Sequence, residues 1–408
     1  MKPALYPRED YLRKLRPFYD SDLIKVITGI RRAGKSCLLL SVMDELRKRN
    51  VPEKDIIYLN LDKRGFKGIK TPEQLEEAIN ARVEDGDFKY LFIDEVQNVA
   101  DFEVVVNAYR EEGNFSVFIT GSNSYLLSGE LVTKLTGRYV EIELFTLSFP
   151  EYLAMKQFLG KPLLDQAQEF ALYLQNGGFP KSLEFDDEAA RRLYLQSVVD
   201  QILKKDVARK YKIRHRSVFE RVRTYVINNF GATMSLTGLE DYFRNREKVA
   251  IRRETLKRYL DILIDSKVLY RCMRFDMKSR KSIAGEEKYY LADTGIYFAL
   301  NVDGRINYGP ALENIVYTYF KSKGYEMSVG RIGKLECDFI ARRNQDYAYI
   351  QVAMTIAEKE TEDREYRSLE RIFDAYPRYL LTLDTLLQKR SGILHQNLIQ
   401  FLSCEGMS

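Results

Sequence analysis

The hydrophobic residues of the first 150 positions fall into short runs that alternate with amphipathic helical segments. The runs are rich in Val, Ile, Leu, Phe and Tyr, and they occupy residues 23–27, 56–61, 90–93, 117–120 and 139–144. Short apolar runs between helical segments are typical of strands in a parallel sheet that is covered on both faces. We therefore expect residues 1–150 to form an α/β domain. Between the second and third runs, Thr71, Pro72 and Gln74 predict a helix start with a capping box.

A glycine-rich motif follows the first of these runs. Residues 29–36 read Gly-Ile-Arg-Arg-Ala-Gly-Lys-Ser, fit G-x-x-x-x-G-K-[ST] at each fixed position and precede a helical run. Between a strand and a helix this pattern forms a phosphate-binding P-loop, because backbone N–H groups curl inward and the helix N-terminus adds its positive dipole end. Lys35 would contact the β- and γ-phosphates of ATP, and Ser36 would ligate Mg²⁺. A chance glycine-rich turn is the alternative. The expected nucleotide-binding residues are Gly29, Ala33, Gly34, Lys35, Ser36 and Cys37.

A pair of acids ends the third apolar run. Residues 90–95 read Tyr-Leu-Phe-Ile-Asp-Glu, so four apolar residues precede Asp94 and Glu95. A strand buried on both faces carries carboxylates at its C-terminal tip, where the ligands of parallel sheets bind. We expect Asp94 to hold the Mg²⁺ shell and Glu95, beside the metal, to orient or polarise an attacking water. A solvated acidic turn is the alternative.

These motifs resemble the AAA+-like ATPases of the additional-strand-catalytic-glutamate division. More narrowly, the chain resembles, over almost its whole length, a family of prokaryotic ATP-binding proteins that join an AAA ATPase domain to a C-terminal domain called DUF4143. The landmarks are residues 29–36, 94–97, 120–123, 135–138, 147–149 with Glu151, and 177–180. Thr146 stands where the family usually has a proline, a departure that touches a linker. The resemblance implies that residues 117–123 insert a strand between the P-loop strand and the acid strand, and that Ser122 or Asn123 senses the γ-phosphate.

Arg138, which precedes the last apolar run, has two interpretations. An arginine near the γ-phosphate, from the same or a neighbouring subunit, stabilises transition-state charge as a finger does. The alternative is a structural arginine that pairs with a carboxylate at the sheet end or solvates the start of the strand.

The pattern becomes helical after Phe149, and residues 151–214 are expected to form a helical lid and linker. Residues 177–180, Gly-Gly-Phe-Pro, interrupt it as a turn, because two glycines and a proline do not fit inside one helix. The last helix of this segment leads into a basic block. Residues 201–280 hold 21 Lys and Arg against 9 Asp and Glu, a net of +12, in a chain whose total is +5. Such a block is an electrostatic footprint typical of nucleic-acid binding.

Three amphipathic segments and a short extended stretch within residues 215–300 predict a winged helix. The helices cover residues 217–229, 235–243 and 254–263, and the extended stretch covers 268–272. Four basic residues fall on or just before the recognition helix, where double-stranded DNA would dock: Arg252, Arg253, Lys257 and Arg258. The equally weighted alternative is a protein-interaction domain whose charges are solvated.

Residues 301–408 resemble, more remotely, the core of PD-(D/E)xK nucleases. Glu313, Glu336 and Asp338 precede residues 349–353 at the spacing of such a site. The resemblance implies a Glu at position 351 that binds Mg²⁺ and a Lys at position 353 that activates water. Gln351 and Ala353 stand there instead, and neither side chain has that chemistry. We therefore expect a disabled α/β nuclease fold that serves packing, nucleic-acid backbone binding or self-association.

Composition excludes several other classes. The chain has four cysteines without C-x-x-C spacing and two histidines, which argues against structural zinc, a disulfide framework and a Ser-His-Asp hydrolase. The longest uncharged stretch, residues 113–129, is interrupted by Asn, Ser and Gly, so we expect no membrane span. The first ten residues are charged and lack the apolar core of a secretory signal, so we expect a cytoplasmic protein.

The sequence thus predicts an ATP- and Mg²⁺-binding AAA+-like ATPase with slow turnover. Hydrolysis would be coupled to rearrangement of a C-terminal half that binds DNA through residues 201–280, a protein partner, or a second copy of the chain. Two other classes stay open. One is a nucleotide-gated scaffold or switch with little turnover, against which the intact Glu95 argues. The other is an ATPase-regulated DNA nuclease, against which Gln351 and Ala353 argue.

Overall fold

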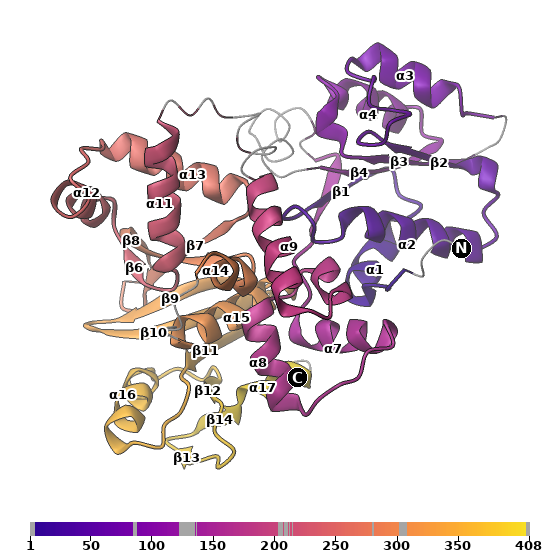
Figure 1. Ribbon diagram of the computed structural model, residues 1–408. Coiled ribbons are helices and arrows are strands. Elements are labelled where there is room, and N and C mark those ends of the chain that lie inside the picture. The colour runs from indigo at the N-terminus through magenta and orange to yellow at the C-terminus, as the bar shows by residue number, and fades with distance from the viewer. Residues whose placement is uncertain are drawn as a thin grey trace. The chain divides into compact units, whose positions relative to one another are not determined.

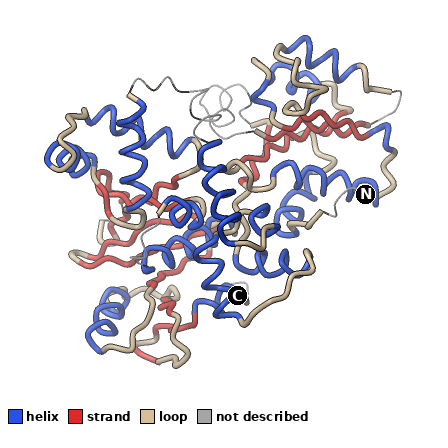
Figure 2. The backbone as a smooth tube through the Cα atoms, viewed as in Figure 1, coloured by secondary structure: helices blue, strands red, loops and turns tan. Residues whose placement is uncertain are grey.

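The chain divides into two compact units. The computed structural model describes residues 5–84, 88–121, 135, 137–202, 207, 211, 213, 215–279, 281–301 and 308–404. The first unit comprises residues 1–145 with 201–210, and the second comprises residues 146–200 with 211–408. Figures 1 and 2 show the path of the chain through each unit.

A parallel sheet forms the centre of the first unit. Over the described residues it has five strands in the order β2-β3-β4-β1-β5, so β4 lies between β1 and β3 as the resemblance implies. The strands are β1 (Ile24–Thr28), β2 (Ile56–Asn60), β3 (Lys89–Asp94), β4 (Phe115–Thr120) and β5 (Tyr139–Glu143). The helices are α1 (Glu9–Leu15), η1 (Arg16–Phe18), α2 (Lys35–Lys48), η2 (Glu53–Asp55), α3 (Pro72–Asn80), η3 (Val96–Asn98) and α4 (Phe102–Glu111). The predicted α/β class and parallel sheet are confirmed.

Both faces of this sheet are buried, as the uninterrupted apolar runs predict. Helices α3 and α4 cover one face and α1 and α2 cover the other (Figure 1). Successive residues of β3 point to opposite faces. Leu91 and Ile93 join the apolar cluster with α3 and α4, whereas Phe92 stacks on Phe118 with ring centroids 4.6 Å apart. Helix α3 begins with the predicted capping box, in which the Thr71 side chain accepts from the backbone N–H of Gln74.

The second unit begins with helices and continues into a mixed sheet. Its first elements are α7 (Phe149–Phe158), α8 (Gln166–Asn176), η4 (Pro180–Glu184) and α9 (Glu188–Gln201). Then follow α11 (Arg216–Asn228), β6 (Thr233–Met234), α12 (Leu236–Asn245), α13 (Arg253–Asp265), β7 (Leu269–Asp276) and β8 (Lys281–Leu291). The last elements are α14 (Thr294–Leu300), α15 (Tyr308–Ser322), β9 (Glu326–Ile332), β10 (Leu335–Arg343), β11 (Asp346–Val352), α16 (Lys359–Glu370), β12 (Arg378–Thr382), β13 (Lys389–Arg390), β14 (Ile393–Asn397) and α17 (Leu398–Ser403).

One sheet runs through the part of the second unit that follows α9. Among the described residues its nine strands have the order β13-β14-β12-β11-β10-β9-β7-β8-β6. Strand β7 pairs in parallel with β9, so the segments expected as a winged helix and as a nuclease-like domain share a sheet. Helices α15 and α16 lie on opposite faces of β10, because Phe339 contacts Tyr317 of α15 whereas Ile340 joins the cluster that contains Tyr366 of α16.

The Gly-Gly-Phe-Pro segment leaves α8 in a turn, as predicted, and it closes around a buried carboxylate. Gly177 has φ 68°, and a Cβ there would lie 1.6 Å from Asp293 Oδ1. Asp293 accepts hydrogen bonds from the backbone N–H groups of Gly178 and Gly295, each at 2.8 Å. Burial raises the pKa of Asp293 to about 6. The glycine is therefore required by the close approach of this side chain.

Over the described residues, no helix is both long and apolar enough to cross a membrane.

Candidate nucleotide-binding site

The glycine-rich loop lies between β1 and α2, as the motif predicts. Strand β1 ends at Thr28, and α2 begins at Lys35 with Gly34 as its N-cap. Gly29 has φ 133°, and a Cβ there would lie 2.1 Å from the carbonyl oxygen of Leu144. No other residue fits this position, because the loop passes directly over the backbone that follows β5. The first turn of α2 directs its backbone N–H groups at the loop, which is the usual arrangement of an anion site.

The Lys35 side chain lies within the loop. The residue is 6% exposed, and its Nζ donates to the carbonyl oxygens of Gly29 at 2.9 Å and Ile30 at 3.3 Å. A phosphate oxygen offers an ammonium a charge-assisted hydrogen bond that is stronger than one to a neutral carbonyl. The amine is therefore placed where a bound polyphosphate would recruit it.

Asp94 ends β3 and is fully buried. Its Oδ1 accepts from the Thr120 hydroxyl at 2.5 Å, and its Oδ2 accepts from Asn60 Nδ2 at 2.7 Å and from the Tyr58 hydroxyl at 3.1 Å. Burial raises the pKa of Asp94 above its ordinary value, against the opposing effect of hydrogen bonds that include one from Ser36. The structure therefore brings Ser36 and Asp94, from two different elements, into contact.

A hydroxyl and a carboxylate side by side at a phosphate loop are a fitting donor set for Mg²⁺. This ion prefers oxygen ligands and keeps several waters, so it needs few groups from the protein. Ser36 and Asp94 would hold it, directly or through water. The two side chains come from α2 and β3 and already lie close enough to interact.

Glu95 adopts a left-handed backbone conformation, with φ 60° and ψ 47°. This region is costly for a residue with a Cβ, and such strain is held only where the surroundings fix it. Thr120 provides the restraint, because its hydroxyl accepts from the Glu95 backbone N–H at 3.0 Å while it donates to Asp94. The Glu95 carboxylate accepts a hydrogen bond from the side-chain amide of Gln97. Because of this turn, the carboxylates of Asp94 and Glu95 point in different directions.

Three residues of this site were missed by sequence reasoning. Thr120, Asn60 and Tyr58 complete the shell around Asp94. The available signal was their position, since Asn60 and Thr120 are polar residues at the C-terminal ends of strands that flank β3. The carboxyl ends of parallel strands meet at one edge of a sheet, so such residues converge.

The structure does not bring Arg138 to the phosphate loop. Its carbonyl oxygen accepts from the backbone N–H of Ile24 at the start of β1, whereas the loop follows the end of β1. At about 3.3 Å per residue, the two ends of this strand are roughly 15 Å apart. The Arg138 side chain donates to Asn107 Oδ1 at 3.0 Å and pairs with Glu111 at 3.5 Å. This corrects the interpretation of Arg138 as a finger within its own subunit. The other predicted residues at this edge, Ser122 and Asn123, lie outside the described residues.

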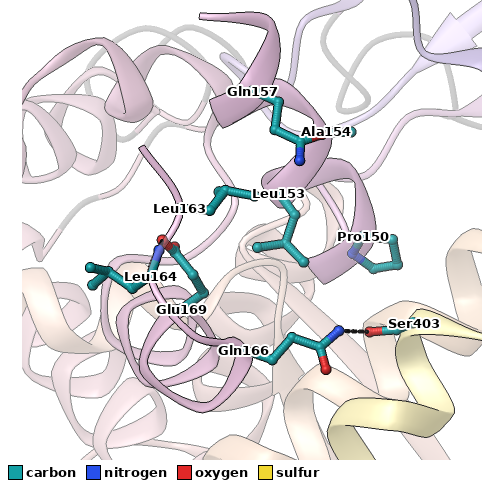
Figure 3. Close-up of a pocket in the computed structure, with 9 residues that line it drawn as sticks. All are labelled: Pro150, Leu153, Ala154, Gln157, Leu163, Leu164, Gln166, Glu169 and Ser403. Carbon is teal, nitrogen blue, oxygen red and sulfur yellow. Dashed lines mark hydrogen bonds between the residues drawn. The ribbon is translucent and has the colours of Figure 1, made fainter. Parts of the chain in front are cut away.

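A separate pocket lies in the second unit between α7 and α8, with a volume of about 380 Å³ (Figure 3). Leu153 and Leu163 line it, and Gln166 reaches across to the Ser403 hydroxyl at 3.4 Å (Figure 3). Its acid, Glu169, pairs with Lys156 at 2.6 Å and accepts from the Leu164 backbone N–H at 2.9 Å. The pocket thus combines an apolar wall with an acid that Lys156 already neutralises, whereas the glycine-rich loop offers phosphates a lysine and the N-terminus of a helix.

Comparison with known proteins agrees with this geometry. Residues 21–153 match a family model described as an AAA domain (AAA_14), and residues 167–305 match a domain of unknown function (DUF8612), not the DUF4143 domain named by the resemblance. The solved structure of a Walker-type ATPase of Pyrococcus abyssi is similar with a TM-score of 0.51 and 16% identity, over 73% of this chain and 96% of that one. At this identity the similarity shows the fold alone.

Two relatives in sequence are themselves described as uncharacterized. A Methanocaldococcus jannaschii protein is 30% identical over 74% of this chain and 67% of its own length. A Haemophilus influenzae protein is 34% identical over 94% of both chains. The chain belongs to the same family as the Haemophilus influenzae protein, and its first unit is a P-loop ATPase domain of the AAA type.

Proposed function

We propose that this protein binds ATP with Mg²⁺ and hydrolyses it, and that hydrolysis drives rearrangement of its C-terminal half. The observation that carries the proposal is the meeting of three groups at one sheet edge. Ser36 at the start of α2 contacts Asp94 at the end of β3, and the strained turn at Glu95 follows directly. These are a metal-holding pair and a neighbouring carboxylate, which is the set that phosphoryl transfer to water requires.

Each residue has one role in this proposal. The loop N–H groups bind the phosphates, and Lys35 turns from the carbonyls of Gly29 and Ile30 to the β- and γ-phosphate oxygens. Ser36 and Asp94 hold Mg²⁺, which neutralises charge on the phosphates when it is bound. Glu95 orients water and accepts its proton. The Gln97 amide donates to one oxygen of the Glu95 carboxylate and competes there with the attacking water, so we expect slow turnover.

We infer that residues 215–300 form a winged helix. The order α11, β6, α12, α13, β7, β8, with β8 paired to both β6 and β7, supports this inference. Helix α13 would be the recognition helix, and Arg252, Lys257 and Arg258 are exposed there. Arg253 is partly neutralised, because it pairs with Glu240 at 2.5 Å. A surface of this kind binds DNA through phosphates with little sequence preference, or it binds an acidic protein.

We also infer that residues 301–408 form a nuclease-like fold without nuclease activity. Helix α15, strands β9 to β11, helix α16 and strand β12 follow in the order of such a core. Gln351 Nε2 donates to Glu365 at 2.8 Å, and its Oε1 accepts from the Asp338 backbone N–H at 3.2 Å. The amide thus serves the hydrogen-bond network of the sheet rather than a metal.

The test is the rate of ATP hydrolysis by the full chain, with and without Mg²⁺ and with and without double-stranded DNA. We expect Mg²⁺-dependent turnover that DNA stimulates. Turnover without any effect of DNA would reject the DNA-binding surface and favour a protein partner. Tight ATP binding without turnover would favour the nucleotide-gated switch, and no ATP binding would reject the proposed function as a whole.

A further inference from the structure

A cluster of charged side chains is buried in the second unit, at the place where an active nuclease would hold its metal. Lys288 of β8 projects into it with a side chain that is 7% exposed. Its Nζ lies 2.9 Å from Glu336 Oε1, 3.1 Å from Glu313 Oε2 and 3.8 Å from Asp338 Oδ1. These acids come from β10 and α15, so one ammonium connects three elements that are far apart in the sequence.

The acids surround an ammonium at the distances of hydrogen bonds rather than those of metal ligation. The distances of 2.9 and 3.1 Å from Lys288 are those of charge-assisted hydrogen bonds, whereas Mg²⁺ needs oxygen ligands at about 2.0–2.1 Å. Among the described residues, no group of three or more Asp, Glu, His or Cys side chains is placed to hold a metal ion. Three acids that would face a divalent cation in a nuclease face an amine here.

The charges in the cluster are balanced by their neighbours. Arg274 of β7 is a second partner of Glu336, and the hydroxyl of Tyr290 donates to Glu313 at 2.8 Å. Burial alone would raise the pKa of Glu336, but Lys288 and Arg274 hold it below its ordinary value. Burial raises the pKa of Asp338 well above its ordinary value, and Glu313 adds to this effect. Each of the two carboxylates nearest to Lys288 is thus also bound by a second donor, Arg274 or Tyr290, which is the condition for keeping buried charge.

We propose that Lys288 is the resident cation of this centre, where its ammonium takes the place of a divalent metal and fastens β8 to β10 and α15. The centre is thereby closed to metals in the native chain. Because β8 also belongs to the proposed winged helix, the same ammonium fixes that segment to the C-terminal sheet. This inference goes beyond the proposed ATPase activity and does not rest on it.

The first test is a stability cycle on the full chain. Lys288→Met keeps the apolar stem but removes the charge, which leaves Glu313 without its cation and Glu336 with Arg274 alone, so we expect the melting temperature to fall by roughly 6–20 °C. Adding Glu313→Gln removes the orphaned charge and is expected to recover at least half of that loss. A Lys288→Met chain that melts with the wild type, or a double variant that gains nothing, would overturn the proposal.

The second test is Mn²⁺ binding without nucleotide, followed by electron paramagnetic resonance of the free ion. Lys288→Ala opens the space, and we expect it to bind one Mn²⁺ more per chain than the wild type. Adding Asp338→Asn should abolish the gain. If the wild type already binds that ion and Asp338→Asn loses it, or if Lys288→Ala folds but gains none, the proposal is refuted.

Mn²⁺-dependent nicking of plasmid DNA by the wild type, lost in both Lys288→Met and Asp338→Asn, would instead identify Lys288 as a displaced catalytic lysine. Should Lys288→Ala not fold, the stability cycle decides.

Discussion

Thr120→Val tests whether a single buried hydroxyl positions both acids of the nucleotide site. Thr120 is fully buried, and its hydroxyl donates to Asp94 at 2.5 Å while it accepts from the Glu95 backbone N–H at 3.0 Å. Valine has the same shape without the hydroxyl, so the change removes both hydrogen bonds and creates no cavity. The left-handed turn at Glu95 then loses its restraint.

The magnitude follows from the groups that are left unsatisfied. A half-buried N–H and a buried carboxylate oxygen lose their partner at a cost of about 1–3 kcal/mol each, so we expect a loss of roughly 3 kcal/mol in the free energy of unfolding of the first unit. That corresponds to a fall in Tm of roughly 6–12 °C. A displaced Glu95 should lower the kcat of ATP hydrolysis by roughly 10- to 100-fold. The KM for ATP should change by less than about 3-fold, because the loop that binds the phosphates is untouched.

The assay is steady-state ATPase kinetics below the melting temperature, with Thr120→Ser as the matched control. Serine keeps the hydroxyl, so kcat should stay within about 3-fold of the wild type. Wild-type kcat in Thr120→Val would refute the assignment of Thr120 as the residue that positions Asp94 and Glu95. An equal loss in the serine variant would show that the methyl group, and not the hydroxyl, is what matters.

Three further predictions concern folding and binding. Burial lowers the pKa of Lys25 to about 7 from 10.5, so at this site the unfolded chain binds more protons between pH 7 and 10.5, and the contribution of Lys25 to stability rises with pH by about 4–5 kcal/mol across that window; the difference in the free energy of unfolding between the wild type and Lys25→Met, measured by chemical denaturation, should shift in favour of the wild type by that amount. Gly29→Ala should abolish binding of a fluorescent ATP analogue, since its Cβ would strike the backbone of the chain after β5, whereas Gly65→Ala, which meets nothing within 4 Å, should bind normally. If α13 docks on DNA phosphates, Lys257→Ala should weaken binding equally for unrelated sequences and reduce the slope of log affinity against log salt by about 1, as measured by fluorescence anisotropy; an unchanged slope would reject this contact.

The features that the sequence predicts well are local. The apolar runs become the strands of the first sheet, because a strand buried on both faces must be apolar throughout. The capping box at Thr71 and the loop at residues 29–36 also form as their patterns require, since each depends on residues within a few positions of one another. In such cases the backbone conformation follows from nearby side chains alone.

The features that the sequence does not predict depend on register and long-range pairing. The sequence around Arg138 does not indicate at which edge of the sheet this residue lies. The pairing of β5 with β1 places it at the edge opposite to the glycine-rich loop. No local feature of the sequence predicts that β7 pairs with β9, because any exposed strand edge can pair with another strand. Likewise Lys288 reads as one charge in a polar strand, and only the fold brings it to Glu313, Glu336 and Asp338.

The most direct test of the central claim compares ATP binding and ATP turnover in two variants of the full chain. Lys35→Ala removes a phosphate ligand, so binding should be lost. Glu95→Gln removes only the group that accepts the proton of water, so ATP and Mg²⁺ should bind about as tightly as in the wild type while hydrolysis falls by at least about 100-fold. Undiminished hydrolysis in Glu95→Gln, or equal loss of binding in both variants, would contradict the account.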